Sequence, residues 1–157
     1  MAMAENMEST MKPGMAGLVR QLYGYLGWLP LSLIQLMARC SLAVIFWRAG
    51  ETKSANWDLT VQLFASEYKV PVLPPDVAAT IAYTFEHYCP MFLVAGLATR
   101  VAVLPLIGMT LVIQTFVYPQ AWPDHLTWMT MMLLLLSRGA GVVSLDHLAK
   151  KVIDRHM

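Results

Sequence analysis

The sequence has few charged residues. Asp, Glu, Lys and Arg make up only 13% of its 157 residues, against roughly a quarter in an ordinary soluble domain. A domain of this size leaves much of its surface exposed, and so few charged side chains cannot coat that surface evenly. Hydrophobic residues make up 57% of the chain, and the mean hydropathy is +0.53. These values argue against a soluble globule and favour a protein embedded in lipid.

The sequence also lacks an excess of either charge. Eleven basic side chains oppose ten acidic ones, so the formal net charge is +1. Because no basic surplus is present to neutralise a phosphate backbone, we expect no nucleic-acid partner. Cysteine is scarce as well. Cys40 and Cys89 lie in apolar stretches without metal-ligand or CxxC spacing, and we interpret them as packing residues.

Motifs for redox cofactors are absent. The chain carries no flavin or dinucleotide fingerprint, no haem-attachment motif and no iron–sulfur spacing. The 12 methionines invite a copper site, but those at 129–132 point around a helix rather than toward one place. We therefore expect no metal site. Any electrons that the protein handles must come from another molecule.

Long apolar runs are what the sequence does have. The run from Trp28 to Trp47 matches a helix of about 30 Å, the thickness of the hydrocarbon core. The expected fold class is all-α, an integral membrane four-helix bundle over residues 28–145. It is flanked by an N-terminal extension (1–27) and a basic C-terminal tail (146–157), with a long outward-facing loop between its first two helices. The four predicted spans are at about 28–47, 76–97, 101–118 and 123–138.

Basic residues predict the orientation of these spans. Both termini and the turn at 96–100 lie on one side, which carries seven Lys and Arg: Lys12, Arg20, Arg100, Arg138, Lys150, Lys151 and Arg155. The other side carries three, Arg48, Lys53 and Lys69. By the positive-inside rule, we expect both termini in the cytoplasm.

Two ionisable residues, Arg39 and Glu86, lie inside predicted antiparallel spans. Measured from the outer ends at Arg48 and Asp76, where Asp76 is the expected helix N-cap, their depths agree to within a few ångströms. An unpaired charge in the membrane is costly, so we expect the two to pair near the midplane. Such a pair serves either to hold the helices together or to bind a ligand or transfer protons.

Each predicted span carries one polar stripe. Tyr83, Glu86 and His87 share a helical face, and similar spacing puts polar residues on one face of each other span. We predict two candidate sites in the polar interior. The first is an intramembrane site of Arg39, Tyr83, Glu86, His87 and Gln114, and the second an outer-face site of Arg48, Lys53 and His125. The alternatives are an interhelical hydrogen bond for His87 and an interfacial anchor for His125.

Four short motifs follow one another along these spans, and three of them lie at span ends. They are FWRAGETK at 46–53, Glu86 with Pro90, GLATR at 96–100, and RGAGVVSLD at 138–146. In this order they resemble the DoxX family of small four-helix bacterial membrane proteins. The resemblance draws attention to Arg48, Gly50, Lys53, Glu86, Arg100, Arg138, Gly139, Gly141, Ser144 and Asp146.

The resemblance implies a multi-pass protein of the bacterial inner membrane with redox chemistry related to sulfur, thiols or oxidative stress. The leading hypothesis is a subunit that binds quinone, or supports electron transfer to the quinone pool, beside a soluble or peripheral oxidoreductase. Gly50 is expected to end the first helix, where Lys53 and Trp57 form a pocket for an anionic or quinone-like head group.

Two other functions are open: a non-catalytic membrane anchor or assembly subunit, and a permease for small solutes or metals. The lipid bilayer is an expected partner, and a homo-oligomer is a further candidate. The sequence assigns no catalytic residue and leaves open whether the protein is an enzyme.

Overall fold

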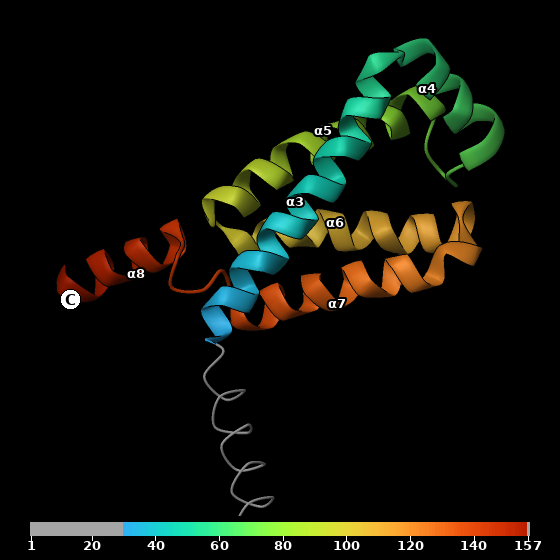
Figure 1. Cartoon of the computed structure of the whole chain (residues 1–157). Helices are drawn as coiled ribbons and strands as arrows, with labels where there is room; N and C mark the ends of the chain where they lie inside the picture. Colours follow the sequence, from blue (N-terminus) through green and yellow to red (C-terminus); the bar gives the residue numbers. More distant parts are fainter. Residues whose placement is uncertain (1–29, 157) are drawn as a thin grey trace, which may run out of the picture. The chain divides into compact units, whose positions relative to one another are not determined.

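A computed structural model describes residues 30–156, and every regular element in that range is helical. This confirms the all-α prediction for the described part, while the predicted extension at 1–27 lies outside it. The four long helices are α3 (Leu31–Ala55), α5 (Pro75–Ala95), α6 (Thr99–Val112) and α7 (Trp122–Arg138) (Figure 1). The shorter elements are α4 (Trp57–Leu63), the π-helices η2 (Phe64–Tyr68) and η3 (Ile113–Val117), the 3-10 turn η4 (Pro119–Ala121), and α8 (Leu145–His156).

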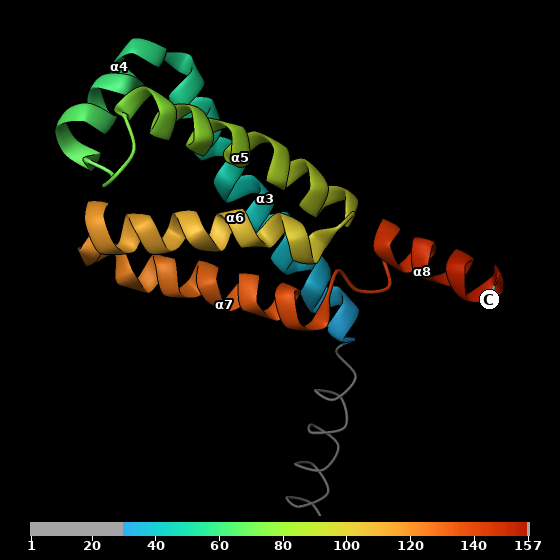
Figure 2. The same cartoon turned by 180° about the vertical axis from the view of Figure 1, so that it is seen from behind.

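The four long helices share one hydrophobic core. Leu42 of α3, Leu93 of α5, Leu106 of α6 and Leu135 of α7 are completely buried and belong to a single cluster. Helix α6 lies between α5 and α7, and α3 crosses them obliquely, as the two opposite views show (Figures 1 and 2). Each long helix therefore directs one apolar stripe toward a common centre.

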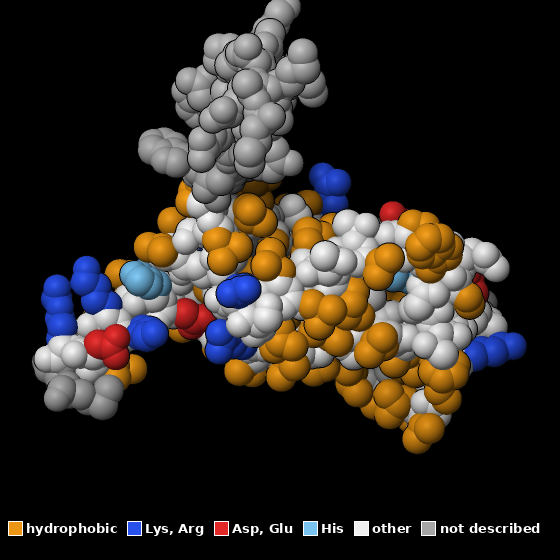
Figure 3. All heavy atoms as spheres, turned by 90° about the horizontal axis from the view of Figure 1, so that it is seen from below, with side chains coloured by type: hydrophobic (Ala, Val, Ile, Leu, Met, Phe, Trp, Pro, Cys, Tyr) orange, Lys and Arg blue, Asp and Glu red, His pale blue; other side chains and the backbone are white. Residues whose placement is uncertain are grey.

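Within residues 30–156, two helical segments are long and apolar enough to cross a membrane, Leu31–Ala55 and Thr99–Val117. Helix α5 has 21 residues but carries Glu86 and His87 in its middle. Helix α7 has 17 residues, which is at the lower limit for a spanning helix. The second and fourth predicted spans therefore stay predictions. Apolar side chains form a broad band across the helices, with charged side chains mainly toward its ends (Figure 3).

The predicted loop after the first span is largely helical. Helix α3 continues to Ala55, and α4 and η2 follow after Asn56, whose side chain accepts a hydrogen bond from the Leu59 N–H at 3.1 Å. The expectation that Gly50 ends the helix is wrong, because Gly50 is buried inside α3. A Cβ atom there would lie 2.5 Å from His87 Nδ1. Close packing against α5 thus outweighs the helix cost of a glycine, about 0.5–1 kcal/mol.

Helix α5 begins one residue earlier than expected. Pro75 occupies its first position and Asp76 lies in the first turn, so Asp76 is not the N-cap. The helix ends at Gly96, which has a left-handed backbone with φ of 64°. The Leu97 N–H then donates to the Phe92 carbonyl at 3.0 Å, which is a Schellman ending.

Asp146 joins the predicted C-terminal tail to the other helices. Its Oδ1 accepts from the Ala98 N–H at 2.7 Å, and its Oδ2 accepts from the Thr99 N–H at 3.0 Å. Its own N–H donates to the Gly96 carbonyl at 2.9 Å. Asp146 therefore caps the N-terminus of α6, where unpaired N–H groups and the helix dipole favour a carboxylate.

We expect Asp146→Ala to lower the free energy of unfolding in detergent by about 1 kcal/mol, the usual cost of losing an N-cap. The measurement is an SDS titration in mixed micelles followed by circular dichroism. Asp154→Ala is the control, because Asp154 is an exposed carboxylate on the same helix. Equal stability of the two variants would show that the cap does not stabilise α6.

Candidate functional site

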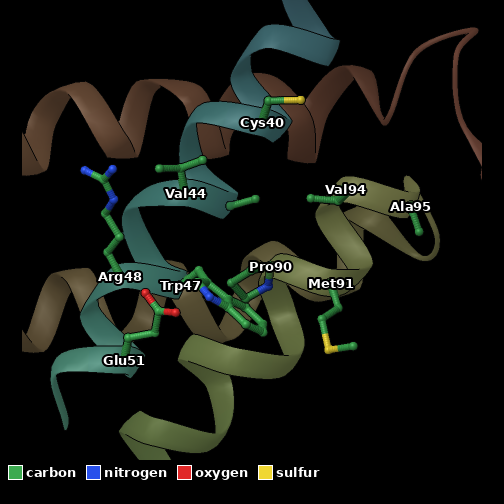
Figure 4. Close-up of a pocket in the computed structure, with 10 residues that line it drawn as sticks. Cys40, Val44, Trp47, Arg48, Glu51, Pro90, Met91, Val94 and Ala95 are labelled. Carbon is green, nitrogen blue, oxygen red and sulfur yellow. The ribbon is translucent and has the colours of Figure 1, made fainter. Parts of the chain in front are cut away.

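The helices enclose two hollows of similar size. One is a groove of about 640 Å³ between α3 and α5. In it Trp47 lies beside Pro90, and Val44 and Val94 approach from the two helices (Figure 4). Its polar side chains, Arg48 and Glu51, both come from α3. Because the groove is otherwise apolar, it lacks the convergent polar groups of a binding site.

The second hollow, called the cavity below, has a volume of about 670 Å³. Its walls come from α3, η2, α5, α6, η3 and α7, and most of its lining is apolar. Its polar side chains converge from separate elements: Lys53, Tyr68, Glu86, Tyr118 and His125. Its aromatic lining includes Phe46, Phe64, Phe85 and Trp128. Apolar walls with a few convergent polar groups are typical of a ligand site.

Helix α6 leaves room for the cavity because it presents small side chains there. Pro105 and Gly108 both line it. A Cβ atom on Gly108 would have no neighbour within 4 Å. At one end the π-helices meet, with the rings of Tyr68 and Tyr118 at 5.8 Å and the Tyr118 hydroxyl donating to Glu67 Oε1 at 3.0 Å. Single-turn π-helices are frequent at functional sites.

A partly buried ion pair forms one polar wall of the cavity. Lys53 Nζ, on the last turn of α3, lies 2.7 Å from Glu86 Oε1 of α5. The Glu86 side chain is only 3% exposed, and its Oε2 has no hydrogen-bond partner among the described residues. Burial strengthens the attraction within the pair but makes an unpaired polar atom costly. Glu86 therefore keeps one buried acceptor atom without a partner, on a side chain that lines the cavity.

His125 of α7 forms a second polar wall of the cavity. Its Nδ1 lies 2.7 Å from Gln114 Oε1, and Gln114 Nε2 donates to the Pro119 carbonyl at 2.9 Å. His125 is buried, and its ring packs edge-on against Trp128 with centroids 5.1 Å apart. These contacts fix the position of the imidazole at the cavity wall.

The expectation that Arg39 pairs with Glu86 is wrong. The buried Arg39 guanidinium instead donates to four backbone carbonyls. They are Leu93 at 2.7 Å and Val94 at 2.8 Å, at the end of α5, and Ala140 at 2.9 Å and Val143 at 2.6 Å, between α7 and α8. The difference arises because α3 continues past its predicted end, which brings Lys53 rather than Arg39 opposite Glu86. Arg39 therefore lies where α5 and α7 end, and its cation favours those carbonyls.

The four hydrogen bonds of Arg39 are called the Arg39 clamp below. Residues of the motifs GLATR (96–100) and RGAGVVSLD (138–146) surround this clamp. Gln35 Nε2 donates to the carbonyls of Arg138 at 3.1 Å and Gly139 at 2.9 Å. Gly96 and Gly141 have positive φ and pack closely on Arg39 and Gln35. The Arg100 side chain donates to the Ser137 carbonyl at 3.2 Å, and the Ser144 hydroxyl to the Gly141 carbonyl at 2.6 Å. These contacts indicate a structural role for both motifs.

The remaining candidates lie outside the cavity lining. Tyr83 and His87 form an aromatic row with Trp57 and Trp47, and successive ring centroids are 4.4–5.8 Å apart. Arg48 lines the groove instead. Among the described residues, no group of three His, Cys, Asp or Glu side chains is arranged to hold a metal ion. The cavity thus joins Glu86 of the predicted intramembrane site with Lys53 and His125 of the predicted outer site, and Gln114 supports His125 from behind.

Comparison with known proteins places this architecture in a family. The chain matches the DoxX family over residues 34–119, more than half of its 157 residues, and it therefore belongs to that family. The match includes the first three motifs and ends before RGAGVVSLD. No curated protein and no solved structure matches the chain. The protein is thus an all-helical member of a membrane family and contacts the lipid bilayer.

The ion pair makes a prediction for stability. Lys53→Met should lower the free energy of unfolding by about 3 kcal/mol, because it leaves the Glu86 carboxylate buried without a partner. Adding Glu86→Gln should recover more than half of that loss. SDS titration of the single and double variants measures the coupling.

The matched control is a second cycle that combines Arg39→Lys with Glu86→Gln. Arg39 and Glu86 share no hydrogen-bond partner, and Gly50, which packs on Glu86, lies about 16 Å along α3 from Arg39. The effects in this cycle should therefore add. Additive effects in the Lys53 cycle would contradict the pairing.

Proposed function

We propose that this DoxX-family protein binds a quinone in the cavity and thereby supports electron transfer to the quinone pool of the bacterial inner membrane. The observation that carries the proposal is the cavity, in which a partly buried lysine–glutamate pair and a fixed histidine converge within apolar walls. Its volume of about 670 Å³ lies in the range of small-molecule sites.

A quinone ring fits the lining of these walls. Its ring is flat and apolar, and its two oxygens lie on opposite edges. Phe46, Phe85 and Trp128 supply aromatic surface for the ring. Lys53 with Glu86 on one side, and His125 on the other, supply polar groups for the two oxygens. The apolar lining of α6 and η3 suits an isoprenoid chain.

The electrons must come from a partner. Because the sequence carries no motif for a flavin, haem or iron–sulfur cluster, the proposal includes a soluble or peripheral oxidoreductase that delivers them, in thiol, sulfur or oxidative-stress chemistry. A homo-oligomer is compatible with this arrangement. The protein itself then acts as the quinone-binding subunit.

The structure gives less support to the permease alternative. Between the Arg39 clamp and the cavity, the core contains the fully buried side chains of Leu42, Leu93, Leu106 and Met132. A solute path along the helices would have to cross this apolar layer. A pure anchor or assembly subunit would not need the cavity, so ligand binding separates that alternative from ours.

The proposal includes a topology. We propose that α3, α5, α6 with η3, and α7 form a transmembrane four-helix bundle with both termini in the cytoplasm. Supporting it, the Arg39 clamp joins the start of α3 to the ends of α5 and α7, which gives alternating helix directions. Arg100, Arg138, Lys150, Lys151 and Arg155 then lie toward the cytoplasmic side.

For the topology, we expect a C-terminal green fluorescent protein fusion to fluoresce in the bacterial cell and a C-terminal alkaline phosphatase fusion to be inactive. Fluorescent protein folds in the cytoplasm, whereas the phosphatase needs the oxidising periplasm for its disulfides. Fusions after Asn56, in the predicted outer segment, serve as the matched control and should behave oppositely. An active C-terminal phosphatase would contradict the proposed orientation.

For the binding function, we expect a short-chain benzoquinone to quench the tryptophan fluorescence of the purified protein saturably. We also expect organic solvent to extract a quinone from protein that has been purified from its native membrane. Gly108→Leu should weaken binding at least tenfold, because its side chain would fill the open space beside Gly108. It should leave stability unchanged or raise it, since leucine favours helix more than glycine does.

The control variant is Leu104→Phe, which adds bulk on α6 at a residue that is 53% exposed and outside the cavity lining. Its affinity for the benzoquinone should equal that of the unmodified protein. Equal quenching by the Gly108 and Leu104 variants would mean that the quinone does not bind in the cavity. No saturable binding at all would favour the anchor alternative.

A further inference from the structure

We propose that the cavity selects the reduced, dihydroxy form of its ring ligand, a quinol, over the oxidised quinone, because hydrogen-bond acceptors stand on both of its polar walls. The inference rests on the proposed function and adds the redox form that the site prefers. It follows from the hydrogen-bond state of Glu86 and His125.

Glu86 provides the first acceptor. Its Oε1 accepts from Lys53 Nζ at 2.7 Å, while its Oε2 is buried and accepts from no described residue. A buried acceptor without a partner carries a desolvation cost that a ligand hydroxyl can remove. A quinone carbonyl cannot remove it, because the carbonyl oxygen has no proton to donate.

His125 provides the second acceptor. The Gln114 amide is oriented by its donation from Nε2 to the Pro119 carbonyl, so its Oε1 faces His125 Nδ1 as an acceptor. The Nδ1 atom must therefore carry the proton. In neutral imidazole the other nitrogen is then an acceptor, and Nε2 has no hydrogen bond to another described residue. A second ligand hydroxyl is the complementary group.

Lys53 does not reverse this preference. Its ammonium group donates to Glu86 Oε1 at 2.7 Å and to the Ala49 carbonyl at 3.4 Å, which leaves one of its three protons free. A ligand hydroxyl can accept that proton while donating its own to Glu86. A quinone carbonyl that accepts from Lys53 would instead face the lone pairs of Glu86 Oε2. The hydroxyl therefore satisfies both groups, and the carbonyl satisfies one.

The test compares three ligands of nearly equal shape by calorimetry under argon, with the full-length protein in detergent. They are a decyl-substituted benzoquinone, its quinol, and the dimethyl ether of that quinol, which keeps both oxygens but has no O–H donor. We expect the quinol to bind at least tenfold tighter than either of the others. That margin is modest for two hydrogen bonds, one of them to a charged acceptor.

Two variants locate the preference. Glu86→Gln and His125→Phe should each reduce the ratio of quinone to quinol dissociation constants by at least threefold. Because the two residues belong to different walls of the cavity, the test needs only one of the two variants to fold. Asp58→Asn is the matched control. Asp58 is exposed and outside the cavity lining, and its loss should leave the ratio unchanged.

The outcomes separate this inference from the proposed function. Equal or tighter binding of the quinone overturns the inference while the quinone-binding function stands. Equal binding of the quinol and its dimethyl ether also overturns it, because donors would then be irrelevant. If the quinol preference persists in a folded Glu86→Gln or His125→Phe variant, the acceptor role assigned to that residue is wrong. Binding of none of the three ligands overturns both proposals.

Discussion

The Arg39 clamp is the interaction on which the remaining structure depends. A guanidinium group in an apolar interior needs hydrogen-bond partners, and here Arg39 donates four hydrogen bonds to backbone carbonyls, two at the end of α5 and two between α7 and α8. Because the Arg39 side chain reaches both helix ends, it sets how far α5 and α7 extend along α3. With that register set, the last turn of α3 stands beside the middle of α5. Lys53 meets Glu86 as a consequence.

The two polar regions of the protein differ in how completely their hydrogen-bonding groups are paired. At the clamp, the side chains of Arg39 and Asp146 bond to backbone groups at helix ends and in the segment that follows α7. At the cavity, Glu86 retains an unused oxygen atom, and the helical face that would fill the space carries Pro105 and Gly108 instead of large side chains. The first region has the character of a structural joint, and the second that of a binding site.

Sequence periodicity predicted much of this arrangement. Glu86 and His125 were expected in a polar interior because their helices have apolar stripes elsewhere, and both line the cavity. The prediction that Arg39 pairs with Glu86 was wrong for a specific reason. The end of the first helix was placed near Trp47 because glycine and polar residues follow, but Gly50 is held inside the helix by the His87 ring. That contact joins residues far apart in the sequence, and no local pattern contains it. The acceptors of Arg39 are backbone carbonyls, which every residue has, so the residue types do not reveal which carbonyls Arg39 contacts.

The position of these carbonyls affects how the chain assembles. Arg39 belongs to the first long helix, whereas Ala140 and Val143 follow the last one, more than 100 residues later. At usual rates of synthesis, roughly 5 to 20 residues per second, that interval takes on the order of 5 to 20 seconds. During this time Arg39 lacks two of its four acceptors, because only the carbonyls of Leu93 and Val94 are made earlier. The clamp is therefore complete only after the C-terminal segment has been made, and its closure belongs to the last steps of folding.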